Sequence, residues 1–210
     1  MHKGIPQELF NLYSDLGAVV IWYVRLRWCI CPFEKIAQHV SLKGTIVDVG
    51  CGYGLLSNLL ALTSQERDVI GIDLSPKRIR AAQRTVKGRR NIKFLLQDAS
   101  SLKVEKCDVF VMSDFLHHLP YGHQEELLAV CYQKLLKNGL LIMEEVDGKP
   151  FWKYQFTIIA DGLLNLGQRI YFRNSSEYLK LLSKIGFQIK TEKAHKGLPF
   201  SDILYLCKKN

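Results

Sequence analysis

The segment SDFLHHLP, residues 113–120, places His117 and His118 side by side directly after an apolar run. An imidazole can act as a general base, as a metal ligand or as a hydrogen-bonded scaffold group. Metal ligation is disfavoured, because neither an H-x-x-x-H spacing nor a cluster of carboxylates accompanies the pair. Adjacent residues do not share one face of a helix, so we expect one ring to face a site and the other to point away.

Two further residues could act as a base or orient a reacting group. Tyr171 ends an aromatic segment, and His195 lies in the loop EKAHKGLPFSD between the last two predicted strands. A base is needed only where the nucleophile must lose a proton. The catalytic candidates are therefore His117, His118, His195 and Tyr171, while a scaffold role for the paired histidines and an exposed loop position for His195 stay open.

The segment VDVGCGYGLL, residues 47–56, leaves a predicted strand through a glycine-rich turn and enters a helix. Gly50, Gly52 and Gly54 let the backbone turn tightly and approach a ligand closely. Leu55 stands where a dinucleotide-binding fingerprint would carry its third glycine, which disfavours pyrophosphate binding.

Two acids accompany this loop. Asp73 ends the second predicted strand, where a carboxylate can accept hydrogen bonds from ribose hydroxyls. Asp48 precedes the first glycine of the loop, where it can hold a cationic group such as a ligand ammonium and would repel a pyrophosphate. The loop and the two acids predict a nucleoside-binding site.

Short apolar strands alternate with helices through the middle of the chain. The expected strands are 45–50, 69–74, 91–98, 107–114 and 140–146, and the expected helices are 55–62, 76–86 and 124–136. This alternation predicts right-handed βαβ crossovers and a mostly parallel sheet covered by helices on both faces.

The two ends of the chain add to this core. We expect helices over 7–31 and 33–40, a turn at 138–139, an aromatic and helical segment over 151–172, a helix over 175–185 and a terminal β-hairpin. The prediction is a single domain, 1–210, divided into a helical lid (1–40), a ligand-binding core (41–148), an insert (149–174), and a final helix and hairpin (175–210). The lid and the insert could both cover the carboxyl edge of the sheet, where ligands bind in such folds.

The chain has a formal net charge of +9, which favours an anionic partner without choosing its class. Eight of the basic residues lie between positions 77 and 93, with no acid among them. This stretch is either a solvated helix face or a docking patch for an anionic membrane surface or an acidic carrier protein.

The six cysteines are scattered, without a CxxC pair or zinc-ligand spacing, which fits a reducing cytoplasm. The run LGAVVIWYV, residues 16–24, lacks the features of a signal peptide and is too short to span a bilayer. Its aromatic residues could pack as a lid or lie at a membrane surface. We therefore expect a cytoplasmic protein, with peripheral contact to the inner face of the membrane as an option.

Five segments in order resemble the motifs of the class I S-adenosylmethionine-dependent methyltransferases. They are VDVGCGYG, GIDLS, FLLQDAS, DVFVMSDFLHHLP and LLKNGLLIMEE, and they fall between about residues 40 and 146. The resemblance implies a Rossmann-like α/β fold, in which a mostly parallel seven-stranded sheet has an antiparallel last strand.

The resemblance also implies S-adenosylmethionine as the cofactor and a set of residues around it. Asp73 would hold the ribose, Asp98 and Ala99 would face the adenine, and His118 would contact the cofactor, which leaves His117 for solvent or acceptor. The full implied set is Asp48, Gly50, Cys51, Gly52, Gly54, Asp73, Leu74, Asp98, Ala99, Ser113, Phe115 and His118. We expect no metal.

The acceptor is expected to be small and hydrophobic, and aromatic, quinone-, polyketide- or lipid-like. SDFLH stands where methyltransferases of nucleic-acid bases and protein amides typically show N/D-P-P-Y/F, so nucleic acid is not the expected partner. Two alternatives stay open: an RNA methyltransferase that uses residues 77–93, and a non-catalytic adaptor with the same fold.

Overall fold

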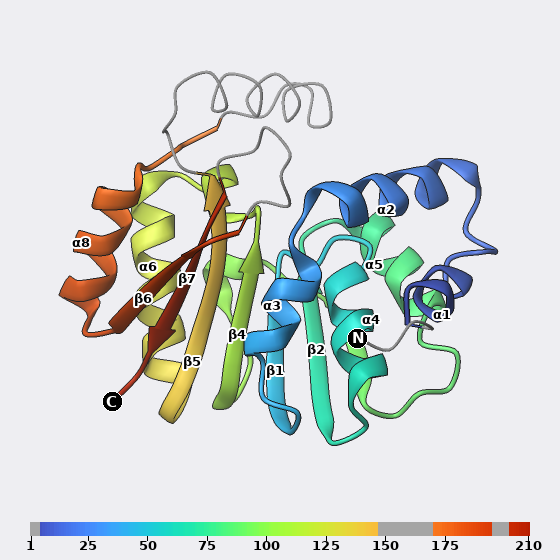
Figure 1. Cartoon of the computed structure of the whole chain (residues 1–210), viewed down its shortest axis with the longest axis horizontal. Coiled ribbons are helices and arrows are strands. Elements are labelled where there is room, and N and C mark those ends of the chain that lie inside the picture. Colours follow the sequence, from blue (N-terminus) through green and yellow to red (C-terminus); the bar gives the residue numbers. More distant parts are fainter. Residues whose placement is uncertain (1–4, 147–169, 195–201) are drawn as a thin grey trace.

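The computed structural model describes residues 5–146, 170–194 and 202–210. Seven strands form one sheet in the order β3-β2-β1-β4-β5-β7-β6 (Figure 1). The strands are β1 (Gly44–Val49), β2 (Arg67–Asp73), β3 (Ile92–Leu96), β4 (Cys107–Ser113), β5 (Leu135–Val146), β6 (Gln188–Lys193) and β7 (Asp202–Lys208). The first five strands are parallel, and β7 runs antiparallel to both β5 and β6. The predicted fold class is confirmed.

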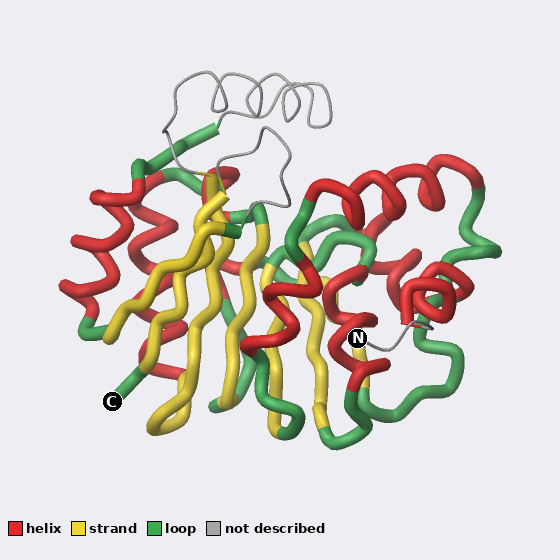
Figure 2. Tube along the Cα trace, in the orientation of Figure 1, coloured by secondary structure: helices red, strands yellow, loops and turns green. Residues whose placement is uncertain are grey.

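Helices cover both faces of the sheet (Figures 1 and 2). One layer is made by α1 (Ile5–Asn11), α2 (Ala18–Ile30), α3 (Phe33–His39), α4 (Leu55–Thr63) and α5 (Pro76–Arg84), and the other by α6 (Tyr121–Lys134) and α8 (Ser175–Ile185). Successive strand residues point to opposite faces. In β1, Ile46 packs into the first layer and Val47 into the second, which explains why the strand is apolar throughout.

Local signals in the sequence set several helix ends. In α8, Asn174 and Glu177 form a reciprocal capping box, and Gly186 ends the helix in a left-handed conformation. In α5, the Ser75 hydroxyl accepts a hydrogen bond from the backbone of Arg78, and Pro76 occupies the first turn. The predicted bounds of α8 are those of the structure.

Two predicted boundaries were wrong by more than two residues. The turn expected at Asn138 and Gly139 lies inside β5, which begins at Leu135. Asn138 has a φ of 63°, and the pairing with β4 jumps from Cys107–Leu135 to Val109–Leu140, so the turn bulges the strand instead of preceding it. The helix expected from 124 begins at Tyr121.

The strand order reverses at β1, which lies between β2 and β4. Ligands bind at such a reversal, beyond the carboxyl ends of the strands. In Figure 1, α2 lies across this edge, so the N-terminal helices reach the expected ligand site. The proposed division of the chain into lid, core, insert and tail stays a prediction.

His195 and most of the predicted segment 151–172 lie outside the described residues. Among the residues that the structure describes, no helix is both long enough and apolar enough to cross a membrane.

Candidate functional site

The glycine loop joins β1 to α4 in a conformation that requires glycine. Gly54 has a φ of 78°, and a Cβ there would lie 2.5 Å from the ring of Phe94. Any other residue at position 54 would push α4 away from β3. Gly54 does not line the cavity described below, so the structure gives it a packing role, and its expected ligand contact stays a prediction.

Asp73 ties the end of β2 to this loop. One carboxylate oxygen accepts a hydrogen bond from the backbone N–H of Gly52 at 2.9 Å, and the other accepts from Ser75 at 2.8 Å. Each carboxylate oxygen has two acceptor positions, so both can accept a further hydrogen bond from a ligand. The Asp73 carboxylate is therefore held in place and can still accept hydrogen bonds from a ligand.

A cavity of about 730 Å³ opens at the carboxyl edge of β1, β2 and β4. It brings together most of the residues expected around the cofactor: Asp48, Gly50, Cys51, Gly52, Asp73, Leu74, Asp98, Ala99, Ser113, Phe115 and His118. A Cβ on Gly52 would meet nothing within 4 Å, so the loop is open towards this space. The volume falls in the range of small-molecule sites.

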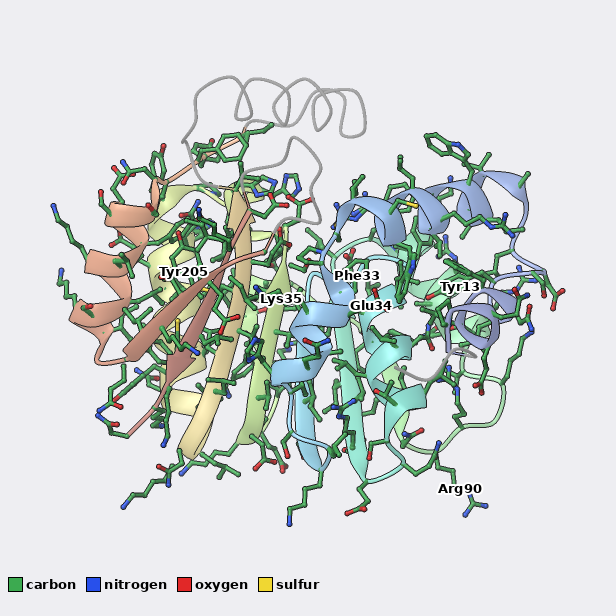
Figure 3. The ribbon with its side chains drawn as sticks, in the orientation of Figure 1. Tyr13, Phe33, Glu34, Lys35, Arg90 and Tyr205 are labelled. Atoms are coloured by element: carbon green, nitrogen blue, oxygen red, sulfur yellow. The ribbon has the colours of Figure 1, made fainter. Side chains whose placement is uncertain are left out.

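The N-terminal helices form another wall of the cavity. Tyr23 and Phe33 line it, and the Tyr23 ring meets the ring of Tyr53 in the glycine loop edge-on, with centroids 5.2 Å apart. The Tyr13 hydroxyl donates to the backbone carbonyl of Tyr53 at 3.1 Å. Figure 3 labels Tyr13 and Phe33 on this side of the molecule. The aromatic N-terminal segment thus fixes the loop from outside.

Asp48 is a buried carboxyl at the base of the cavity. Burial is the main cause that raises the pKa of Asp48 to about 7; a hydrogen bond from Ser57 at 2.5 Å opposes the rise, and the nearby Asp73 adds to it. Below neutral pH the folded protein therefore keeps a proton on Asp48 that an exposed aspartate has lost. A cationic ligand group nearby would favour the ionised form.

This proton predicts a pH-dependent stability. Between about pH 4 and pH 7 the folded state binds a proton on Asp48 that the unfolded chain releases, so stability should fall as the pH rises, by at most about 1.4 kcal/mol per pH unit. Asp48→Asn should reduce this slope, because an amide does not titrate, and its oxygen can still accept from Ser57. The buried Glu144, whose pKa is also raised, accounts for the slope that remains. Urea unfolding from pH 5 to pH 8 measures the slope. Asp68→Asn, at an exposed position of β2, should leave the slope intact, and equal slopes in all three proteins would contradict the assignment.

A cluster of charges lies where β4 ends. Arg27 of α2 forms an ion pair with Asp114, which has a φ of 53° directly after the strand. Burial alone would raise the pKa of Asp114, but the charges of Arg27 and His117 lower it well below the usual range. Asp114 is therefore ionised and holds α2 against the sheet.

The structure corrects the expected orientation of His117. Its side chain is only 1% exposed and does not line the cavity, so it does not face solvent. Nδ1 lies 2.8 Å from a carboxylate oxygen of Glu145, and the ring stacks on Phe172. The other Glu145 oxygen accepts from the backbone of Phe115 and Leu116 at 3.1 and 2.6 Å. Glu145 thus locks the turn that carries both histidines.

His118 and Tyr171 are the catalytic candidates that line the cavity. The His118 ring lies 4.2 Å from that of His117, centroid to centroid. Tyr171 is held through its backbone, which donates to the His117 carbonyl at 2.7 Å and accepts from Gln124 at 2.9 Å. Both side chains could contact an acceptor, whereas His117 supports them from behind.

Sequence reasoning missed four residues of the site: Tyr13, Arg27, Asp114 and Glu145. Asp114 and Glu145 each stand at the carboxyl end of a predicted strand, which is a usable signal in a parallel sheet. Tyr13 and Arg27 had no such signal, because their partners lie 40 and 87 residues further along the chain.

Residues 46–139 match a family model described as a methyltransferase domain. The chain is 30% identical over 138 residues to a ubiquinone biosynthesis O-methyltransferase of Coxiella burnetii, covering 63% of this chain and 57% of that protein. It is 27% identical over 148 residues to a carboxy-S-adenosyl-L-methionine synthase of Helicobacter pylori, covering 69% and 56%. The chain thus spans a little over half the length of these curated relatives.

Solved structures share the fold. The magnesium protoporphyrin IX methyltransferase of Synechocystis PCC 6803 with bound SAH aligns with a TM-score of 0.70 and 22% identity, over 97% of this chain and 94% of that one. Human N-acetylserotonin methyltransferase in complex with SAM aligns with a TM-score of 0.68 and 18% identity, over 98% and 56%. Residues 46–139 thus match a methyltransferase domain, and the chain has the fold of the class I S-adenosylmethionine-dependent methyltransferases.

Proposed function

We propose that this protein transfers a methyl group from S-adenosylmethionine to a small hydrophobic acceptor of aromatic, quinone, polyketide or lipid-like character. One observation carries the proposal. A single cavity joins the glycine loop and Asp73 to a wall of Tyr23, Phe33 and Tyr171. A polar nucleoside end and an aromatic end in one space suit a cofactor and an apolar acceptor bound together. The relatives named for methylation of a quinone precursor and of a porphyrin support this acceptor class.

The residues present fit this cofactor. Asp73 has acceptor positions for the ribose, the open side of Gly52 admits a close approach, and Asp98 and Ala99 line the cavity beyond Leu74. When bound, S-adenosylmethionine supplies an electrophilic methyl group on a sulfonium. The chain's own task is then to hold the nucleophile close to that methyl group and in line with it.

His118 is the group that we assign to the acceptor's proton. It lies on the cavity wall, and the Glu145–His117 pair fixes the turn on which it stands. A phenol or an enol gains nucleophilicity when an imidazole accepts its proton. Tyr171, on the same wall, would orient the acceptor by a hydrogen bond or a ring contact.

Several basic side chains of residues 77–93 make contacts within the protein, so fewer of them can bind a nucleic acid than the composition suggests. Arg89 donates to Asn58 and to the backbone of Thr85, inside the helical layer. Arg84 and Lys87 contact Asp15. These contacts hold part of the stretch in packing within the protein, which favours the small-molecule acceptor over RNA.

Methyl transfer can be tested directly with radiolabelled S-adenosylmethionine and a cell extract separated into lipid, nucleic-acid and protein fractions. We expect label in the lipid-soluble fraction and none with heat-treated protein. Label in RNA that is released by ribonuclease would overturn the acceptor class. Calorimetry with S-adenosylhomocysteine separates a non-catalytic adaptor, which would not bind it, from an enzyme whose acceptor is missing from the extract.

His118→Ala should lower kcat by about 100-fold or more if this imidazole takes the acceptor's proton, and a parallel titration with S-adenosylhomocysteine measures the cofactor contact expected of the same ring. His118→Gln separates loss of the base from loss of the side-chain volume. His123→Ala is the matched control, because His123 is exposed on α6. The pH dependence of kcat is measured for the wild type and for His118→Ala. If the fall of kcat at acidic pH were the same in both proteins, the proton transfer would belong to another group.

A further inference from the structure

One face of α2 is exposed and largely apolar. Its exposed residues are Ala18, Val19, Trp22, Arg25 and Cys29, of which the last four recur every three or four positions along the helix. Val19 is 77% exposed and Trp22 is 61% exposed. An exposed tryptophan beside other apolar groups on one helix face makes this face a candidate contact surface.

The opposite face of the same helix belongs to the cavity. Tyr23, Val24 and Arg27 line it, and Arg27 joins α2 to Asp114. A molecule that binds the outer face of α2 is therefore separated from the aromatic wall of the cavity by the width of this one helix. An occupant of that face could deliver an apolar acceptor past the edge of α2 without exposing it to water.

Basic residues of α5 adjoin the start of α2. Lys77, Arg80 and Arg84 recur at i, i+3 and i+7, so they share one face, and all three are exposed. Arg84 donates to the backbone carbonyl of Asp15, three residues before α2 begins, at 3.0 Å. The end of α5 that carries Arg84 therefore lies beside the residues that lead into α2. Arg90 does not belong to the basic face of α5, since it lies at the lower edge of the molecule, whereas α2 lies at the top (Figures 1 and 3).

We propose that α2 and α5 together form a docking surface for an anionic lipid bilayer. The α2–α5 surface consists of Val19, Trp22, Arg25, Lys77, Arg80 and Arg84. Its exposed groups lie along helix faces, which suits a bilayer surface. Tryptophan enters the headgroup region, and lysine and arginine attract anionic headgroups. Delivery of a lipid-like acceptor to the cavity rests on the proposed function, whereas lipid binding itself does not.

Vesicle sedimentation of the full chain tests the surface. The vesicles contain phosphatidylcholine alone or phosphatidylcholine mixed with phosphatidylglycerol. We expect sedimentation with the mixed vesicles only, weakening as salt is raised. Val19→Ser combined with Trp22→Ser should lower the apparent affinity by about tenfold or more. Lys77→Glu combined with Arg80→Glu should lower it by about as much.

Matched controls come from the rest of the surface. Leu42→Ser removes an apolar side chain that is 66% exposed just before β1, at the opposite edge of the sheet. Lys180→Glu combined with Lys184→Glu makes the same charge change on α8. Both controls should sediment as the wild type does, and all variants should bind S-adenosylhomocysteine normally by calorimetry.

Either of two results would overturn the proposal: failure of the wild type to bind mixed vesicles, or equal binding by the α2, α5 and control variants. Binding to an acidic protein without binding to vesicles counts as the first result. Vesicle binding needs neither cofactor nor acceptor. A negative sedimentation result therefore leaves the methyltransferase proposal standing, and a negative methyl-transfer result leaves the lipid-binding proposal standing.

Discussion

Asp73→Ala is expected to weaken binding of S-adenosylhomocysteine by about 100-fold. Hydrogen bonds to a charged acceptor contribute about 1.5–3 kcal/mol each, and the ribose offers two hydroxyls to this carboxylate. The variant also frees the backbone N–H of Gly52, which Asp73 now holds at 2.9 Å, so the loop loses part of its preorganisation. Calorimetric titration of the purified protein measures the affinity.

Two companion variants make this result interpretable. Asp73→Asn keeps one acceptor oxygen and should bind with intermediate affinity. Asp68→Ala alters an exposed acid near the other end of β2 and should bind as the wild type does. A thermal melt of each variant excludes global unfolding. If Asp73→Ala bound within threefold of the wild type, the ribose would have to be held elsewhere.

Arg27→Met is expected to lower the free energy of unfolding by about 2–3 kcal/mol, slightly less than the loss of about 3–5 kcal/mol for breaking a fully buried ion pair. The Arg27 and Asp114 side chains are 15% and 21% exposed, so solvent screens the lost attraction only in part. Hydrogen exchange should show α2 opening more readily, because the pair anchors that helix to the end of β4.

The loss of unfolding free energy in Arg27→Met should depend on pH. The pKa of Asp114 is lowered in the folded wild type, so the stability from its ionised form is present at neutral pH and is lost only in strong acid. Without Arg27 the pKa of Asp114 should rise, because burial then acts with less opposition. The deficit of Arg27→Met should therefore shrink as the pH falls from 7 towards 4.

Arg25→Met is the matched control. Arg25 lies on the exposed face of the same helix and contacts the ring of Phe10 with its guanidinium carbon 5.8 Å from the centroid. Removing it should cost less than about 1 kcal/mol. Equal losses in the two variants would show that the helix needs a long basic side chain anywhere, and not this ion pair.

The order of elements and the ligand edge were predictable from the sequence because both depend on local patterns. Apolar strands alternating with helices predict a parallel sheet, and a glycine turn followed by a strand that ends in Asp73 marks where the ligand site lies. The bulge in β5 was not predictable in this way. The sequence Asn-Gly favours a turn, and only the pairing partners decide whether that turn ends a strand or bends it.

The sequence by itself determined the fold class, the glycine loop and most residues around the cavity, since each depends on neighbours within a few positions or on the end of a strand. The tertiary structure decided which histidine faces the cavity. Glu145, 28 residues away, draws His117 into the interior and leaves His118 on the wall. It also decided that Arg27 of α2 pairs with Asp114, across 87 residues. Such contacts join segments that meet only when the sheet has formed, so no spacing along the chain encodes them.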